Sequence, residues 1–382
     1  MHAGDIFELL RDGRPWTRAE LADATGLARS TIAARIDVLM RLELVAPFGD
    51  ARSTGGRPPA LFALNPAARV VVGVDVGATH VRAAMADLSG DILGEVSASM
   101  DIAEGPEVVL GWVSSTVRAL LKGQRRPVKH LAAIGMGLPG PVEHATGRPI
   151  SPPIMPGWDR YDVPGRLQRE YAVPVLVDND VNIMALGEQQ VHLTDVADLV
   201  LIKVATGIGS GIISGGRLQR GATGVAGDLG HVRVPGADDV TCRCGNTGCL
   251  EAVAAGPALA AQIRAGGGTA QDGQDVVDLV RAGDAVAVDV VRQAGRDIGE
   301  VLTACVSLVN PSVVAIGGSM ARAGEHLIAG VREVVYTRSM PLATEHLSIV
   351  QSSVAENAGV VGAGMLAIEY ALSPEAFHSL AG

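Results

Sequence analysis

VVVGVDVGAT, residues 70–79, joins a run of β-branched residues to a glycine turn, and two later segments repeat this design. The valines predict a buried strand, and Val81–Met85 continues as an extended segment after the turn. Residues 199–212, LVLIKVATGIGSGI, have the same order of strand, glycine turn and extended residues. Residues 313–320, VVAIGGSM, are a strand that meets a glycine pair before a helix. These turns indicate two α/β lobes that face a nucleotide.

The tip of the first turn offers groups that bind phosphate. Asp75 supplies a carboxylate, Gly77 lets backbone N–H groups approach closely, and Thr79 adds a hydroxyl. Such a tip can hold phosphate oxygens and the water shell of Mg²⁺, although Asp-x-Gly also occurs in ordinary turns. If ATP and Mg²⁺ bind, the later turns supply the other nucleotide-binding residues: Thr206, Gly207, Gly209, Gly317 and Gly318.

Length and composition exclude several classes of protein. The chain has 382 residues, of which 48% are hydrophobic and 19% charged, so it is not disordered and is long enough for two or three domains. No apolar run reaches the roughly 18 residues of a membrane helix. The start, MHAGDIFELL, contains acids and lacks the apolar region of a signal peptide. We therefore expect a compact cytoplasmic protein.

The net charge of −10 argues against a nucleic-acid partner only until it is apportioned along the chain. Residues 1–66 contain eight Arg and eight acidic residues, so this segment is neutral. The rest of the chain holds 23 basic and 33 acidic residues and therefore the whole excess. The N-terminal segment is electrostatically distinct from the body.

The N-terminal segment predicts two short helices. Thr17 as N-cap and Glu20 form a capping box, with Trp16 and Leu21 as a hydrophobic staple. Gly26 ends the first helix. The second helix is amphipathic, with apolar residues at helical spacing: Ile32, Ile36 and Leu39. This pattern is typical of a helix-turn-helix.

The polar face of the second helix is the expected DNA contact. If the apolar face is buried, the opposite face lies in the major groove, where Ser30 and Ala34 are small enough to approach base edges. Asp37 shares this face, and we expect it to lie beyond the contact. Three further side chains suit phosphates: Arg29, Thr31 and Arg41.

A hairpin wing is expected next. A strand at 42–45 and a strand at 61–64 flank a loop at 49–59, and Arg57 in this loop can enter a narrow minor groove. Residues 1–66 are thus predicted to be a winged helix-turn-helix domain that binds operator DNA. The alternative is a small dimerisation module.

A carboxylate follows a strand at residues 174–178. Asp180 stands at the carboxyl end of this strand, where α/β proteins keep their chemistry, and can act as general base on a hydroxyl that Asn179 orients. The alternative is that these residues only cap the helix through Met184.

Three of the four cysteines fall within eight residues, CRCGNTGC at 242–249. Cys242, Cys244 and Cys249, with His231 as the available fourth ligand, form a closed tetrahedral set that predicts structural zinc. A disulfide would leave an odd thiol and is disfavoured in the cytoplasm.

The second imidazole nitrogen of His231 needs an acceptor. Asp228 or a ligand hydroxyl can provide it, and Glu251, just after the last cysteine, adds another acceptor. Zinc would then fix a ligand-binding histidine in place.

Together these motifs resemble the ROK family (repressors, open reading frames and sugar kinases), and in particular its members with an N-terminal winged helix-turn-helix. The matching segments span essentially the whole chain: 75–79, 137–142, 156–158, 179–180, 205–231, 242–251 and 316–318. The resemblance implies an α/β fold with two actin-like, hexokinase-type lobes and a sugar between them.

The resemblance also implies roles for individual residues. Sugar-contacting positions fall on Asn179, Asp180, Asp228, His231 and Glu251, with Asp180 as the catalytic base, and zinc ligands fall on His231, Cys242, Cys244 and Cys249. Asp228 stands at a position that resembles one where the kinases have Glu, and Pro153 stands where kinases often have Asn.

Two functions follow. The first is a sugar-responsive repressor, released from its operator when a sugar fills the cleft; the second is an ATP-dependent sugar kinase with an attached DNA-binding domain. Asp75, Gly77, Thr79 and Asp180 keep the kinase hypothesis open.

We place the domains at 1–66, 67–190 and 191–382, with the C-terminal helix packing back on the first lobe. We expect a homodimer or homotetramer with no membrane contact.

Overall fold

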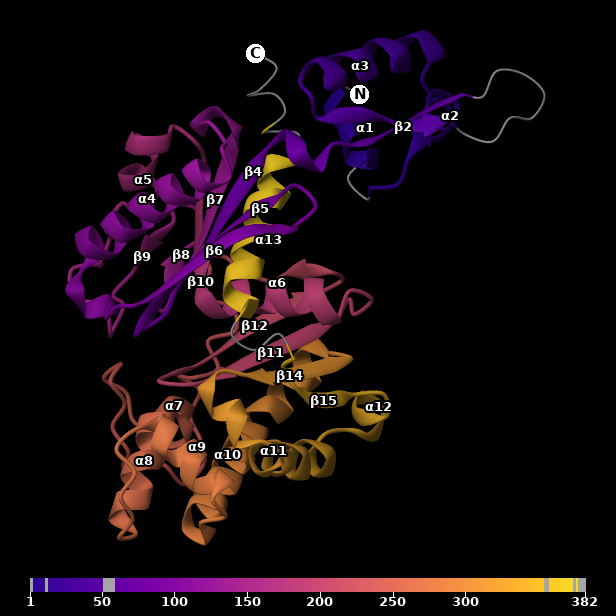
Figure 1. The fold of residues 1–382 in the computed structure, drawn as a ribbon. Helices are drawn as coiled ribbons and strands as arrows, with labels where there is room; N and C mark the ends of the chain where they lie inside the picture. The colour runs from indigo at the N-terminus through magenta and orange to yellow at the C-terminus, as the bar shows by residue number, and fades with distance from the viewer. Residues whose placement is uncertain (1–2, 11–12, 51–58, 354–356, 374–375, 377–382) are drawn as a thin grey trace.

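The computed structural model describes residues 3–10, 13–50, 59–353, 357–373 and 376. A small N-terminal domain stands apart from two larger lobes that lie one above the other in Figure 1. No helix among the described residues combines the length and the apolar character needed to cross a membrane.

The N-terminal domain is a winged helix-turn-helix. Its elements are α1 (Ala3–Leu10), β1 (Trp16–Thr17), α2 (Arg18–Thr25), α3 (Arg29–Arg41), β2 (Val45–Asp50) and β3 (Ala60–Leu64), and the sheet order is β1-β3-β2. The predicted capping box is confirmed, since Glu20 N donates to Thr17 Oγ1 and Thr17 N donates to Glu20. Gly26 ends α2 in the left-handed conformation, with φ 69°.

One boundary in this domain was predicted wrongly. Residues 42–44 form a turn rather than a strand, because Glu43 adopts φ 61° after α3, and β2 instead extends through Asp50. Three side chains of α3 are buried as predicted: Ile32, Ile36 and Leu39.

The first lobe is built on a five-stranded sheet of order β10-β7-β4-β5-β6. Its strands are β4 (Val70–Val76), β5 (His80–Asp87), β6 (Ile92–Ser99), β7 (Leu131–Leu138) and β10 (Val175–Asn179), with the short pair β8 (Val142–Glu143) and β9 (Arg148–Pro149). Helices α4 (Pro106–Gly123) and α5 (Val163–Tyr171) cover one face, and α6 (Asp180–His192) and α13 (Ala358–Ala371) cover the other. The apolar run at Val70–Val76 is wholly buried, as its sequence predicts.

The second lobe repeats this topology. Its sheet has the order β13-β12-β11-β14-β15, formed by β11 (Leu199–Val204), β12 (Ile208–Ser214), β13 (Arg217–Leu218), β14 (Val313–Gly317) and β15 (Ser348–Gln351). Its helices are α7 (Leu250–Ala254), α8 (Gly256–Ala265), α9 (Gly273–Arg281), α10 (Ala285–Val309), α11 (Glu325–Arg338) and α12 (Pro341–Thr344). In each sheet the first strand pairs antiparallel with the next strand and parallel with a later one. The prediction of two α/β lobes is confirmed.

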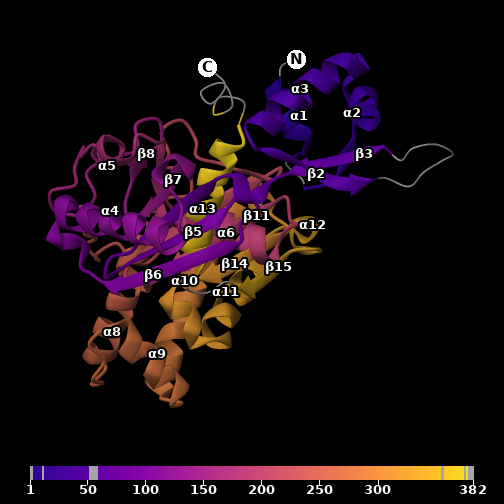
Figure 2. The same cartoon turned by 45° about the horizontal axis from the view of Figure 1, so that its top comes forward.

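Helix α13 crosses from the second lobe back to the first and lies against β4, β7 and α6 (Figures 1 and 2). Glycines make this close packing possible. A Cβ on Gly135 of β7 would lie 2.9 Å from the carbonyl carbon of Ala363, and one on Gly187 of α6 would lie 3.0 Å from the nitrogen of Gly362. Any larger residue at these positions would push the helix away.

The far end of α13 reaches the N-terminal domain. Ala371 and Leu372 share one apolar cluster with Leu39 of α3 and Phe62 of β3. The same cluster includes Val71, at the start of the first sheet. The N-terminal domain is therefore joined to the body by buried side chains as well as by the chain itself.

Candidate functional site

The predicted DNA-contacting residues of α3 lie on one accessible face. Arg29, Ser30, Ala34 and Arg41 are exposed, and Thr31 is half-buried. Asp37 on the same face pairs with Arg18 of α2 at 3.3 Å, so its carboxylate is partly compensated. Arg57 lies outside the described residues.

A cavity of about 800 Å³ lies between the two lobes. This volume is within the range of small-molecule sites. Apart from Gly77, which is buried beneath the His80 ring, every predicted sugar- or nucleotide-binding residue lines it: Asp75, Thr79, Asn179, Asp180, Thr206, Gly207, Gly209, Asp228, His231, Glu251, Gly317 and Gly318. The repeated topology therefore brings together turns that are far apart in the sequence.

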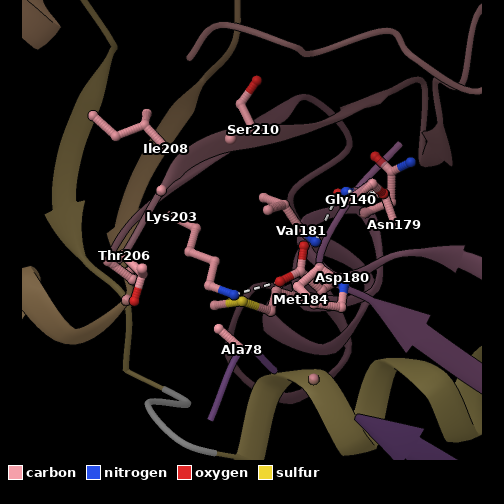
Figure 3. A pocket seen from close by; sticks show the side chains of 18 of the residues that line it. Ala78, Gly140, Asn179, Asp180, Val181, Met184, Lys203, Thr206, Ile208 and Ser210 are labelled. Atoms are coloured by element: carbon pink, nitrogen blue, oxygen red, sulfur yellow. Dashed lines mark hydrogen bonds and ion pairs between the residues drawn. The ribbon is translucent and has the colours of Figure 1, made fainter. Parts of the chain in front are cut away.

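Asp180 begins α6 and points into this cavity (Figure 3). Its carboxylate forms an ion pair with the ammonium of Lys203 at the end of β11. Burial raises the pKa of Asp180, and the Lys203 ammonium opposes this effect. The sequence analysis did not identify Lys203, although a lone cation in the apolar strand LVLIKV was a signal, because lysine is rarely buried without a partner.

Asn179 serves as the N-cap of α6. Its side-chain oxygen accepts a hydrogen bond from Val181 N at 2.9 Å, and its side-chain nitrogen donates to the Gly140 carbonyl at 3.0 Å. The capping alternative is thus realised in the structure. Asn179 still lines the cavity, with one amide hydrogen left to donate.

Asp75 occupies the opposite side of the cavity at the end of β4. Its carboxylate lies 3.6 Å from the imidazole of His80 and packs against Gly359 in the first turn of α13. A carboxylate is favourable there because the N-terminus of a helix carries partial positive charge. Asp75 thus has a structural partner even without a ligand.

Glu251 supports the second glycine turn. Its carboxylate accepts a hydrogen bond from Ile208 N at 3.1 Å, and a Cβ on Gly207 would lie only 2.6 Å from the same oxygen. A side chain at position 207 would therefore displace the Glu251 carboxylate from this hydrogen bond. Asp228 is exposed at the cavity rim.

His231 and the three cysteines converge. Their ligand atoms all lie within 4.8 Å of one another. Cys242 Sγ is 3.8 Å from His231 Nδ1, and Cys244 Sγ is 3.7 Å from Cys249 Sγ. Bonds of ~2.3 Å to a central ion give a tetrahedral edge of roughly 3.8 Å, so the arrangement fits four-coordinate zinc.

A second charged cluster joins the lobes and was also missed. Asp178 of the first lobe is almost fully buried and accepts a hydrogen bond from Arg220 of the second lobe at 2.6 Å. Asn182 donates to the same carboxylate, and His144 lies 3.8 Å from it. Burial lowers the pKa of His144, and Arg220 lowers it further.

Comparison with known proteins identifies the fold. A family model described as ROK family matches residues 71–370. The chain belongs to the ROK family. A xylose repressor of Caldicellulosiruptor bescii is 28% identical over 385 residues, covering 96% of this chain and 95% of the repressor.

Two solved ROK structures are similar to the chain over different extents. A ROK family transcriptional regulator, described as a homologue of the E. coli MLC protein, is 25% identical with a TM-score of 0.84 and covers 99% of this chain and 98% of its own. A ROK glucokinase from Streptomyces griseus, in complex with glucose and AMPPNP, is 28% identical with a TM-score of 0.67 and covers 78% of this chain and 99% of its own. These two regulators match nearly the whole chain, whereas this kinase leaves about a fifth of it unmatched.

Proposed function

We propose that this ROK protein is a sugar-responsive transcriptional repressor. Its winged helix-turn-helix binds operator DNA, and a sugar in the cavity between the lobes releases it. The observation that carries the proposal is the joining of a winged helix-turn-helix to a ROK body in one chain, an arrangement that regulators match over nearly their full length.

For operator binding, the exposed face of α3 enters the major groove. Ser30 and Ala34 approach base edges, and Arg29, Arg41 and the partly exposed Thr31 contact phosphates. The neutral charge of residues 1–66 leaves this face free of the excess negative charge of the body. A two-fold operator requires at least a homodimer, and a tetramer of two dimers satisfies the same requirement.

For effector binding, the sugar occupies the cavity between Asp180 and the glycine turn held by Glu251. Asn179, Asp228 and His231 supply further polar groups at its wall. Carboxylates suit sugar hydroxyls because they accept hydrogen bonds in fixed directions, and the imidazole nitrogen of His231 that does not bind the metal would donate one.

Zinc belongs to the same proposal. His231, Cys242, Cys244 and Cys249 would hold it, and its role would be structural because all four positions are taken by protein. The ion would fix the histidine that lines the cavity, so metal and sugar binding would be coupled.

An ATP-dependent sugar kinase is the second candidate. Asp180 and the Asp75-x-Gly77-x-Thr79 motif favour it, because both stand where a hexokinase-type reaction requires a base and a phosphate turn. ATP and Mg²⁺ would be cofactors only in this reading.

Two experiments separate the candidates. In a gel-shift assay with the operator, the affinity of the full chain should fall when the correct sugar of a panel is added; a DNA affinity unchanged by every sugar contradicts the effector role. In a coupled assay with ATP, Mg²⁺ and the same sugars, turnover that is abolished by Asp180→Asn would establish the kinase. Absence of turnover with all sugars would remove it.

A further inference from the structure

The buried carboxylate of Asp178 is shared by groups from both lobes. Its side chain is 1% exposed. One carboxylate oxygen accepts hydrogen bonds from Asn179 N and from the side-chain nitrogen of Asn182, each at 2.8 Å, and both donors belong to the first lobe. The other oxygen accepts from Arg220 Nε of the second lobe at 2.6 Å. A buried carboxylate needs such partners on both oxygens, and here one of them comes from across the lobe boundary.

Arg220 begins a segment of the second lobe, residues 220–228, that forms part of the cavity wall. The backbone carbonyl of Arg220 accepts hydrogen bonds from Gly224 N at 3.1 Å and from Ala226 N at 3.2 Å. All residues from 224 to 228 line the cavity. Arg220 therefore folds the segment with its carbonyl and reaches the first lobe with its side chain.

The 220–228 segment also touches the first lobe through its backbone. The Thr223 carbonyl accepts a long hydrogen bond of 3.3 Å from His144 N. Gly224 approaches so closely that a Cβ there would lie 2.5 Å from the Val142 carbonyl oxygen. Both contacts involve neutral groups. Because a guanidinium and a carboxylate form a stronger hydrogen bond, the side chain of Arg220 makes the strongest of the described contacts between the segment and the first lobe.

His144 is a second basic group beside Asp178, since its Nδ1 lies 3.8 Å from the carboxylate. Burial and Arg220 both lower the pKa of His144, so Arg220 is the cation that compensates Asp178 at neutral pH. A protonated His144 would compensate the same charge, but it belongs to the first lobe and would not hold the second. Charge compensation and positioning are therefore separable roles.

We infer that Arg220 is a positioning residue of the effector cavity, which holds the 220–228 segment on the first lobe through Asp178. The wall that carries Asp228 is thereby fixed relative to Asn179, because Asp178 also binds Asn179 N. The inference rests on the proposed function, in which a sugar fills this cavity. Its first test uses neither sugar nor DNA, so its failure is distinguishable from failure of the repressor proposal.

The first experiment is hydrogen–deuterium exchange of the full-length protein, read by mass spectrometry. In Arg220→Met, the amides of Gly224 and Ala226 should exchange at least about tenfold faster than in wild type, because the segment opens once its charged anchor is lost. Arg220→Lys keeps the cation and should exchange more slowly than Arg220→Met. Arg217→Met removes an exposed cation from β13, just before the segment, and should exchange as wild type does.

A double variant separates positioning from charge compensation. Asp178→Asn combined with Arg220→Met contains no uncompensated carboxylate, and the asparagine oxygen can still accept from Asn179 N. Its 220–228 segment should exchange as fast as in Arg220→Met, and it serves in place of Arg220→Met if the single variant does not fold. Wild-type exchange of the segment in either variant overturns the inference. So does faster exchange throughout the second lobe, since Arg220 would then stabilise the lobe as a whole.

The second experiment is a calorimetric titration of the same proteins with D-glucose and D-xylose. A sugar that binds wild type should bind Arg220→Met and the double variant at least about tenfold more weakly, because apparent affinity falls with the fraction of molecules that have the wall in place. Equal affinity in wild type and Arg220→Met overturns the inference. If wild type binds neither sugar, that result bears on the effector in the proposed function, and the exchange experiment still decides the role of Arg220.

Discussion

Replacing Gly135 by Ala tests how α13 is held on the first lobe. Gly135 lies in β7, an inner strand of the first sheet, and an added Cβ would stand 2.9 Å from the carbonyl carbon of Ala363 and 3.3 Å from the nitrogen of Ala367. Carbon atoms in contact are normally about 3.5–4.0 Å apart, and the carbonyl oxygen of Ala363 lies nearer still to the added Cβ, so the strand and the helix must separate by more than roughly 1 Å. All three obstacles are backbone atoms, which no rotamer change can move.

The expected loss is about 3 kcal/mol, the upper end of what overpacking costs, because two buried layers must shift together. The assay is urea denaturation of the full chain followed by circular dichroism, comparing midpoints at equal slopes.

Gly364, on the helix α13 that faces Gly135, provides a control. A Cβ there meets no heavy atom within 4 Å, and its φ is not positive. Gly364→Ala should therefore be neutral or stabilising by ~0.5–1 kcal/mol, since Gly is unfavourable inside helices. A Gly135→Ala protein as stable as wild type, or a Gly364→Ala protein as damaged as Gly135→Ala, would refute the packing argument.

Three further predictions concern separate sites. Cys244→Ser should lose bound zinc, measured by elemental analysis, and should bind sugar more weakly. Cys305→Ser changes a buried thiol outside the Cys/His cluster and should retain both zinc and sugar binding. Unaltered sugar affinity in Cys244→Ser would refute the coupling. Thr17→Ala removes the cap of α2 and should cost about 1 kcal/mol of stability, with Thr17→Ser near wild type, measured by thermal unfolding. Burial and Arg220 lower the pKa of His144 in the folded protein. As the pH falls below about 6.5, His144 is therefore protonated in the unfolded chain before it is protonated in the folded one. The stability contributed by neutral His144 is present above that pH and is lost below it. Stability measured between about pH 7.5 and 5.5 should thus fall less in His144→Gln than in wild type; parallel curves would contradict this.

Local patterns were predictable because their causes are local. The capping box of Thr17 and Glu20 is an interaction between residues three apart, and the burial of Ile32 and Ile36 follows from helical spacing alone. The cysteine cluster was predictable for the same reason, since its three thiols lie within one short loop. In each case the interacting residues lie within a few positions of one another in the sequence.

The electrostatics of the cleft were not predictable in this way. Lys203 and Asp180 stand 23 residues apart on different elements, and nothing in the strand LVLIKV specifies which carboxylate the lysine meets. Arg220 and Asp178 are likewise joined only when the two lobes come together. Asn179 presents the converse case: its residue type suits capping and ligand binding equally, and only the contacts with Val181 and Gly140 show that it caps α6.

The proposed release of DNA by a sugar needs coupling between the cleft and the N-terminal domain, and α13 extends from one to the other. Its first turn packs Gly359 against the carboxylate of Asp75 in the cleft, and its end places Leu372 in the apolar cluster of the N-terminal domain. Leu372→Ala should therefore leave sugar affinity unchanged but reduce the effect of sugar on operator affinity, because it loosens only the distal contact. Leu366→Ala removes a side chain of the same size from α13 where the helix packs on the body, away from that cluster, and serves as control. If the operator affinity of both variants responds to sugar as that of wild type does, the coupling runs through another element. If only Leu372→Ala loses its response, α13, which is held at one end by a cleft residue and at the other by the N-terminal domain, links the cleft to that domain.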